Sequence, residues 1–152
     1  MALKKAIQTN FGIAFDDGYH LIGVMEHQIT GQNVTIGIVS YASVEHRAAA
    51  KANMNAYVSA FADYAAKSEA WRTSAEGEPR EAAYATQLLA QHAVRAAETA
   101  VNSTQPLPLA VDKYTLAGSD YLACLDANGE ISRAKVYLWL KQQTKWVDSI
   151  DV

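Results

Sequence analysis

Cysteine is almost absent from this sequence, and its scarcity excludes two kinds of protein. The single residue, Cys124, allows no intramolecular disulfide, and the chain lacks the cysteine cluster of a structural zinc site. Cys124 lies in the apolar run YLACL, which predicts a small buried hydrophobic side chain rather than a reactive thiol.

The sequence also lacks an excess of basic residues and any long apolar run. Residues 1–43, 44–102 and 103–152 each carry one more acidic than basic side chain. No segment forms a basic surface for phosphates, so we expect no nucleic-acid partner. No apolar run reaches the ~18 residues of a membrane span, and MALKKAIQTN lacks the apolar part of a secretory signal. We therefore expect a protein without a membrane span that stays in the compartment where it is made.

Catalytic and cofactor-binding motifs are missing as well. The glycines form no phosphate-binding loop, and no serine or cysteine lies in a nucleophile elbow. None of the histidines forms an HxxxH or HExxH pair; they are His20, His27, His46 and His92. We expect surface or interface positions for these histidines, no metal or cofactor, and a protein that is not an enzyme.

Alanine, in contrast, is abundant in the middle of the chain. It supplies 20 of the 61 residues from Ala42 to Asn102, and it is the strongest helix former. The break TSAEGEP, with Pro79 suited to a first helical turn, predicts an antiparallel pair of helices over residues 43–102. We expect one helix to place Met54, Tyr57, Phe61, Tyr64, Ser68 and Trp71 against Ala82, Ala85, Leu89, Ala93, Ala96 and Ala100 of the other.

The segments on either side are rich in β-forming residues. DDGYHLIGVMEHQI and NVTIGIVSY are joined by a short loop that contains Gly31, which predicts a β-hairpin. Val34, Ile36 and Ile38 share the face that suits the core. The preceding strand is partly apolar on both faces, so one face could pack on a neighbouring subunit.

The C-terminal third predicts further strands and a helix. VDKYTLAGSDYLACLDANGE is typical of one or two strands, after Pro106 and Pro108 have ended the helical region. ISRAKVYLWLKQQ predicts a helix with Leu138 on its apolar stripe, and we expect the tail to dock. The fold class is therefore α+β, in a single domain: a small, mostly antiparallel sheet from residues 1–42 and 103–152, an inserted helical hairpin over 43–102, and a C-terminal helix packed on the sheet.

The helical hairpin predicts a need for partners. Two helices whose mutual contact is mostly alanine bury little apolar area, so the hairpin alone would be only marginally stable. We expect it to be stabilised by packing against copies of the chain. The residues expected at subunit contacts are Met54, Tyr57, Phe61, Tyr64, Trp71, Leu88, Leu89, Trp139, Trp146 and Val152.

The two ends of the chain resemble those of short virion proteins of tailed bacteriophages. The matching stretches are MALKKAI, GYHLIGV and AKVYLWLKQQTKWVDSIDV, and the C-terminal match is carried by Tyr137, Leu140, Lys141, Asp151 and Val152. The resemblance implies a non-enzymatic structural subunit, made in the host cytoplasm and built into the virion near the tail or baseplate. Its partners would be copies of itself and other virion proteins.

The long helical hairpin departs from that pattern and suggests an arm that reaches a neighbouring subunit or a fibre. Three alternatives stay open from the sequence. They are a capsid decoration protein, a small carbohydrate- or ligand-binding module for host attachment, and an enzyme with a dispersed site.

Overall fold

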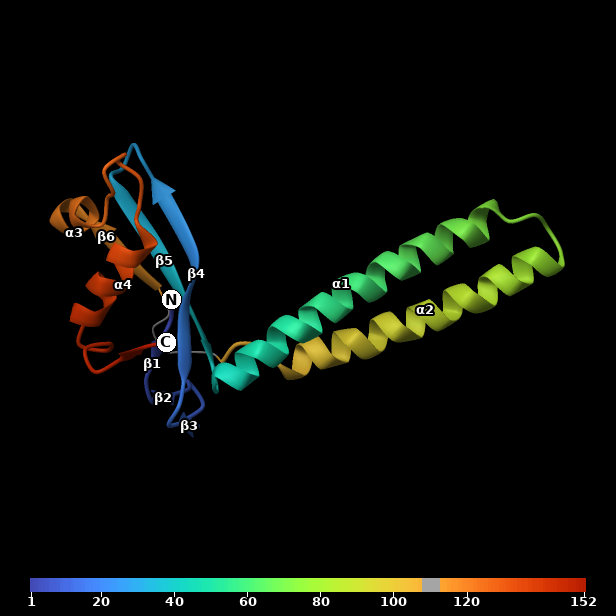
Figure 1. Ribbon diagram of the computed structural model, residues 1–152, viewed down its shortest axis with the longest axis horizontal. Helices are drawn as coiled ribbons and strands as arrows, with labels where there is room; N and C mark the ends of the chain where they lie inside the picture. The colour runs from blue at the N-terminus through green and yellow to red at the C-terminus, as the bar shows by residue number, and fades with distance from the viewer. Residues whose placement is uncertain (108–112) are drawn as a thin grey trace. The chain divides into compact units, whose positions relative to one another are not determined.

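The computed structural model describes residues 1–107 and 113–152 (Figure 1). The chain has an α+β fold, as predicted, with a curled antiparallel sheet and a long helical hairpin. It forms two compact units: the sheet unit contains residues 1–44 and 106–152, and the hairpin unit contains residues 45–105.

The sheet unit is built on five antiparallel strands in the order β6-β5-β4-β1-β7. The strands are β1 (Leu3–Lys4), β4 (Tyr19–Gln28), β5 (Asn33–Tyr41), β6 (Lys113–Ala117) and β7 (Ile150–Asp151). The predicted hairpin is confirmed, because β4 and β5 pair from Tyr19 opposite Tyr41 to Gln28 opposite Asn33. A separate two-stranded ribbon joins β2 (Ile7–Gln8) to β3 (Ala14–Phe15).

A bulge in β4 sets which side chains of that strand enter the core. The pairing with β5 shifts between Ile22 and Val24, so Gly23 is the extra residue. A Cβ atom at Gly23 would lie 2.2 Å from a methyl carbon of Val39, so a side chain there would force Val39 to shift. Because of the bulge, Met25 packs against the core whereas Val24 is exposed.

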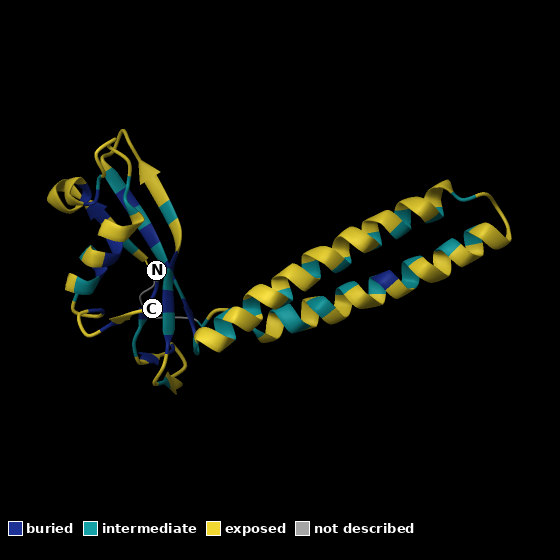
Figure 2. Ribbon diagram, viewed as in Figure 1, coloured by how far each residue is buried: buried dark blue, intermediate teal, exposed yellow. Residues whose placement is uncertain are grey.

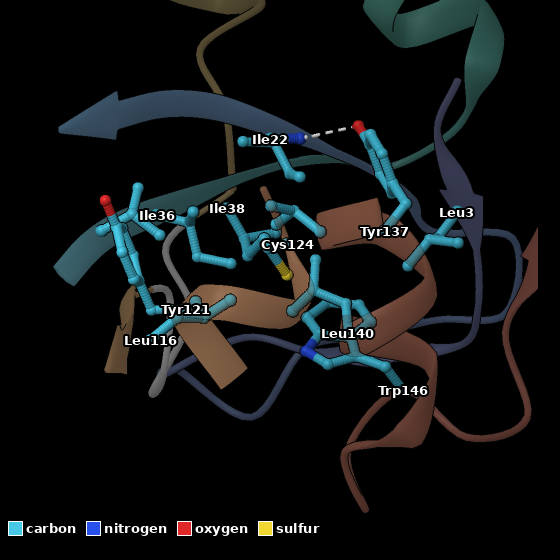
Figure 3. Packing of buried hydrophobic residues seen from close by; sticks show 12 residues of the cluster. Leu3, Ile22, Ile36, Ile38, Leu116, Tyr121, Cys124, Tyr137, Leu140 and Trp146 are labelled. Atoms are coloured by element: carbon cyan, nitrogen blue, oxygen red, sulfur yellow. Dashed lines mark hydrogen bonds between the residues drawn. The ribbon is translucent and has the colours of Figure 1, made fainter. Parts of the chain in front are cut away.

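The core lies between one face of this sheet and two helices, α3 (Gly118–Ala123) and α4 (Arg133–Gln142). Figure 3 shows its buried side chains, which include Ile36, Ile38, Leu116, Leu140 and Trp146. The prediction that Val34, Ile36 and Ile38 face the core is confirmed, and Cys124 is buried as expected.

Two predictions for the C-terminal third are wrong. The stretch GSDYLA forms α3 rather than a strand, because only residues 113–117 pair with β5. In α4 the buried residues are Val136, Tyr137 and Leu140, and the predicted stripe residue Leu138 is exposed. The Tyr137 hydroxyl accepts a hydrogen bond of 2.9 Å from the backbone N–H of Ile22 at the bulge, which fixes the rotation of α4 (Figure 3). Val111 and Asp112, within the same predicted stretch, lie outside the described residues, as does Pro108.

Both ends of the chain are held in the sheet. β1 pairs with β4 on one side and with β7 on the other, and Ala2 and Val152 exchange two backbone hydrogen bonds of 3.1 Å. The indole N–H of Trp146 donates to the hydroxyl of Tyr114 at 2.8 Å. The tail therefore docks, as predicted.

The hairpin unit is formed by α2 (Glu78–Ser103) and by α1 (Val44–Thr73), of which the first residue belongs to the sheet unit; the two helices run antiparallel (Figure 1). Gly77 precedes α2 with a φ of 92°, a conformation that favours glycine, and Pro79 lies in the first helical turn as predicted. α2 ends at Ser103, where the N–H of Thr104 bonds to the carbonyl of Val101 and Pro106 soon follows.

Candidate functional site

The two helices of the hairpin unit meet along a narrow seam. The partly buried positions recur in steps of three and four residues, which is the pattern of a coiled-coil contact (Figure 2). The line with this spacing contains Ala50, Asn53, Tyr57, Ala60, Tyr64, Lys67 and Trp71 in α1, and Arg80, Ala83, Gln87, Ala90, Val94, Ala97 and Val101 in α2. Partly buried residues also lie beside this line: His46, Arg47, Ser68, Leu88, Gln91 and Ala100. Only Ala90 is fully buried.

Polar and aromatic contacts join the helices across this seam. The amide of Asn53 donates to the carbonyl of Ala100 at 3.0 Å, and the amide of Gln87 donates to the hydroxyl of Ser68 at 3.3 Å. The rings of Trp71 and Tyr84 lie 5.7 Å apart. The seam is thus held at both ends, and between them the tyrosines Tyr57 and Tyr64 of α1 alternate with small residues such as Ala60.

The predicted register of the seam is correct for only some residues. Tyr57, Tyr64, Ser68 and Trp71 of α1 and Ala100 of α2 are partly buried and lie on it. However, Met54, Phe61 and Leu89 are 47%, 52% and 70% exposed. The predicted alanines at positions 82, 85, 93 and 96 are also exposed. At these places the seam passes one position away, because Ala60 is partly buried and Ala90 is buried whereas Phe61 and Leu89 beside them are exposed.

This shift leaves an apolar stripe on the outside of α1. We call Met54, Val58, Phe61 and Ala65 the α1 stripe; they are spaced four, three and four residues apart and therefore share one helix face. Val58 is 60% exposed and was not among the predicted contact residues, although its spacing from Met54 could have shown it. The ring of Phe61 lies 6.3 Å from Tyr57 and 6.5 Å from Tyr64, so the stripe continues into the seam.

The other residues predicted at subunit contacts are scattered. Leu88 is partly buried in α2. Trp139 packs against Tyr114 of the core with ring centres 6.0 Å apart, and Val152 is half-exposed beside β1. Trp146 is 2% exposed, so its side chain packs inside the sheet unit and does not reach a partner.

The sheet has a second face that α3 and α4 do not cover. Alternation along β4 and β5 places Leu21, Val24 and Val39 on this face, opposite the core residues Ile22 and Ile38. Val24 is exposed, and Leu21 and Val39 are partly buried. The structure thus agrees with the expectation that β4 is apolar on both faces.

The expected surface position of the histidines is wrong for His20, which is buried in the sheet unit. Its Nε2 lies 3.1 Å from the carbonyl of Lys5 and must donate to it, so Nδ1 accepts from the Ser40 hydroxyl at 2.7 Å. The rings of His20 and Trp146 form a T-shaped pair, with ring centres 4.7 Å apart. Sequence alone gave no signal for this site, because its partners come from three separate segments.

The electrostatics of His20 favour the neutral ring. Burial lowers its pKa from the ordinary value, and the nearby charges of Lys145 and Lys5 lower it further, against the opposing effect of the Lys5 carbonyl. Ser40 is also buried, and the space beside the ring holds no water-sized volume. A serine and a histidine in contact could suggest a catalytic pair, but both side chains are almost fully buried in the sheet unit.

A shallow hollow lies at the tip of the hairpin unit. It has a volume of about 540 Å³ and is lined by Trp71, Gly77, Arg80, Glu81 and Tyr84. The guanidinium group of Arg80 lies 5.7 Å from the centre of the Trp71 ring. The hollow therefore combines two aromatic rings with a cation and a carboxylate.

Comparisons with protein-family models, with curated proteins and with solved structures found no match for this chain. Within residues 1–107 and 113–152, no three His, Cys, Asp or Glu side chains gather where they could hold a metal ion. In the same part of the chain, no helix combines the length and the apolar character needed to cross a bilayer.

Proposed function

We propose that this chain is a structural subunit of a bacteriophage particle. It assembles as multiple copies in the tail or baseplate region and uses the hairpin unit to contact neighbouring subunits or fibres. The observation that carries the proposal is the long hairpin with almost no core: its helices have 30 and 26 residues, and Ala90 is their one buried residue. It acts by shape and buried area, without a catalytic step.

Energetics support a partner for the hairpin unit. Helices gain most of their stability from tertiary packing of an apolar face, and alanines contribute little apolar area to such packing. The large apolar side chains Met54, Val58 and Phe61 lie outside the seam and are about half-exposed or more. A cluster of exposed large apolar residues on a regular element is typical of a protein–protein contact.

The assignment to a virion rests on the resemblance of the chain ends. In the structure these ends hold the sheet unit together. Tyr137 and Leu140 are buried, and Lys141 forms an ion pair of 2.9 Å with Asp151 of β7. The resemblance therefore concerns the sheet unit, and the hairpin unit is the part by which this chain differs.

Light scattering after size exclusion, over a range of protein concentrations, tests the proposed self-assembly. We expect a discrete closed oligomer or a mass that rises with concentration. A compact monomer at every concentration would contradict it. Gold-labelled antibodies on particles that contain the protein test its location: label on the tail or baseplate is expected, and label over the capsid would indicate the decoration protein instead.

The hollow at the hairpin tip favours one second candidate, a carbohydrate-binding module for host attachment. Trp71 and Tyr84 would supply the apolar faces, and Arg80 and Glu81 the polar groups. A glycan array probed with the wild-type protein and with Trp71→Ala tests this candidate. Saturable binding that the substitution abolishes would support it, and no binding by the wild type would reject it.

A further inference from the structure

The buried ring of His20 joins four segments of the sheet unit. It belongs to β4; its Nδ1 accepts from Ser40 of β5, and its Nε2 donates to the carbonyl of Lys5, between β1 and β2. It also pairs with the ring of Trp146, which lies in the segment before β7. We call residues 143–152 the C-terminal tail. The ring of His20 therefore lies where both ends of the chain are fastened to the β4–β5 hairpin.

The hydrogen bonds of this ring suit its neutral form. A neutral imidazole has one donor and one acceptor, and both have partners here. A second proton on Nδ1 would turn that acceptor into a donor, and the hydroxyl hydrogen of Ser40 would then need another acceptor. Ser40 is 1% exposed and His20 is 2% exposed, so this change takes place without access to water. A charge buried in this way is costly.

The groups around the ring act in the same direction. Burial lowers the pKa of His20 most, the Lys5 carbonyl opposes this effect, and the charges of Lys145 and Lys5 lower the pKa further. Tyr137 of α4 borders the same space, and its hydroxyl is neutral because burial raises its pKa.

The carboxylates of the neighbouring segments have other places in the structure. Asp17 pairs with Lys4, and Asp151 of the tail pairs with Lys141, each at 2.9 Å. Asp148 of the tail is exposed. The charges that act on the ring are therefore mainly positive.

The C-terminal tail is fastened by short elements. Its strand β7 has two residues, and Ala2 and Val152 exchange two backbone hydrogen bonds. The indole of Trp146 donates one further bond to Tyr114. Short terminal elements open at a lower free energy than central strands such as β4 and β5.

From this arrangement, we propose that His20 is an acid-sensitive latch for the C-terminal tail. Protonation of the ring undocks the tail, while the β4–β5 hairpin and the rest of the core stay folded. Displacing Trp146 lets water reach the ring, and the bond to the Lys5 carbonyl is kept because Nε2 retains its proton. The latch lies in the sheet unit and is separate from the proposed assembly through the hairpin unit.

Proton linkage sets the size of the effect. In the open state the ring meets water and has an ordinary pKa of about 6.5, whereas the pKa is lower in the docked state. The docked tail therefore has its full stability above pH ~6.5. Below that value the population of the open state rises by up to about tenfold per pH unit, until the pH reaches the lowered pKa.

Thiol labelling of Ser149→Cys in the full chain measures this population. Ser149 lies in the tail and is 6% exposed, and Cys124 lies in the core and is 1% exposed. Both thiols are labelled with 4,4′-dithiodipyridine, which still reacts in acid, and peptide mass spectrometry separates the two sites. At each pH the rates are divided by the rate of glutathione.

We expect the relative rate of the introduced thiol to exceed that of Cys124 and to rise about tenfold per pH unit below pH ~6.5. Equal relative rates at the two sites would show that the whole sheet unit opens together, and the latch would be rejected. A rate at the introduced thiol that does not change with pH would also reject it.

Two histidine variants in the Ser149→Cys background identify the titrating group. His20→Gln keeps a neutral donor and acceptor and should abolish the pH dependence. The matched control is His27→Gln on the same strand, where the imidazole bonds to Tyr121, and it should leave the pH dependence unchanged. Persistence of the pH dependence in His20→Gln would overturn the proposal.

An NMR titration of the imidazole groups of the wild-type protein tests the latch without any substitution. We expect the His20 ring to titrate below pH ~6.5. A midpoint at or above that value would show that the docked tail stabilises the charged ring, and the latch would fail. Because oligomer mass is not involved, this failure leaves the proposed function intact.

Discussion

Removing the hydroxyl group of Tyr137 isolates one buried hydrogen bond that holds α4 against the sheet. The hydroxyl accepts from the N–H of Ile22 at 2.9 Å, and both residues are almost fully buried. Tyr137→Phe keeps the ring and its packing but leaves that N–H without a partner. An unsatisfied buried donor costs about 1–3 kcal/mol, so we expect the free energy of unfolding of the sheet unit to fall by that amount.

Urea unfolding followed by tryptophan fluorescence measures this change. Trp139 and Trp146 report on the sheet unit, and a Trp71→Phe background removes the signal of the hairpin unit. Tyr19→Phe, at a partly buried position of β4, is the control and should change the stability by less than about 0.5 kcal/mol. A loss below about 0.5 kcal/mol for Tyr137→Phe would refute the role given to this bond.

Three further predictions concern the sheet unit and the hairpin unit. The pKa of His20 is lowered in the folded state, so the neutral ring stabilises the fold fully above pH ~6.5. As the pH falls from there toward the lowered pKa, the free energy of unfolding should decrease by up to about 1.4 kcal/mol per pH unit. Urea unfolding midpoints between pH 8 and pH 5 measure this decrease. Gly23→Ala should destabilise the sheet unit by about 1–3 kcal/mol, because the new methyl group meets Val39, again measured by urea unfolding. Phe61→Glu should change the free energy of unfolding by less than about 0.5 kcal/mol but weaken association about tenfold, measured by light scattering.

Each of these predictions has its own control. His20→Gln should flatten the pH dependence relative to wild type, and an equal slope in both proteins would exclude His20 as its source. Val39→Ala should offset part of the loss caused by Gly23→Ala, and simple additivity of the two changes would contradict the proposed clash. Ser59→Glu places the same charge on α1 away from the stripe, and equal loss of association there would show a nonspecific effect of charge.

The elements with strong local signals were predictable from the sequence. Two runs of β-forming residues around Gly31 specify the β4–β5 hairpin, and the side of Val34, Ile36 and Ile38 follows from simple alternation. Dense alanine, the break near Gly77 and Pro79 specify the helical hairpin. These signals depend only on neighbours in the sequence.

The rotation of the helices was not predictable in the same way. In α1, both Ala60 and Phe61 continue a spacing of three and four from Tyr57, and choosing the larger residue gave the wrong register. In α4, apolar residues occur on every side of the helix. Which side is buried is set by the hydrogen bond that the N–H of Ile22 donates to the Tyr137 hydroxyl. That bond depends on a bulge in a strand more than 100 residues earlier.

The buried polar site around His20 was equally difficult to predict from the sequence. The surroundings of His20 are assembled from Lys5, Ser40 and Trp146, which lie far apart in the chain. A lone histidine in a partly apolar strand carries no sign of those partners. The tip hollow is a similar case, because Trp71 and Tyr84 come together only when the hairpin closes.

Hydrogen exchange of the hairpin unit, followed by mass spectrometry at low and high protein concentration, tests the central claim most directly. That claim is that the exposed α1 stripe, from Met54 to Ala65, is covered by a second copy of the chain. It predicts slower exchange of α1 peptides from this region as the concentration and the mass increase. If the mass increases while exchange in α1 stays the same, the chain assembles through another surface, and the account is contradicted.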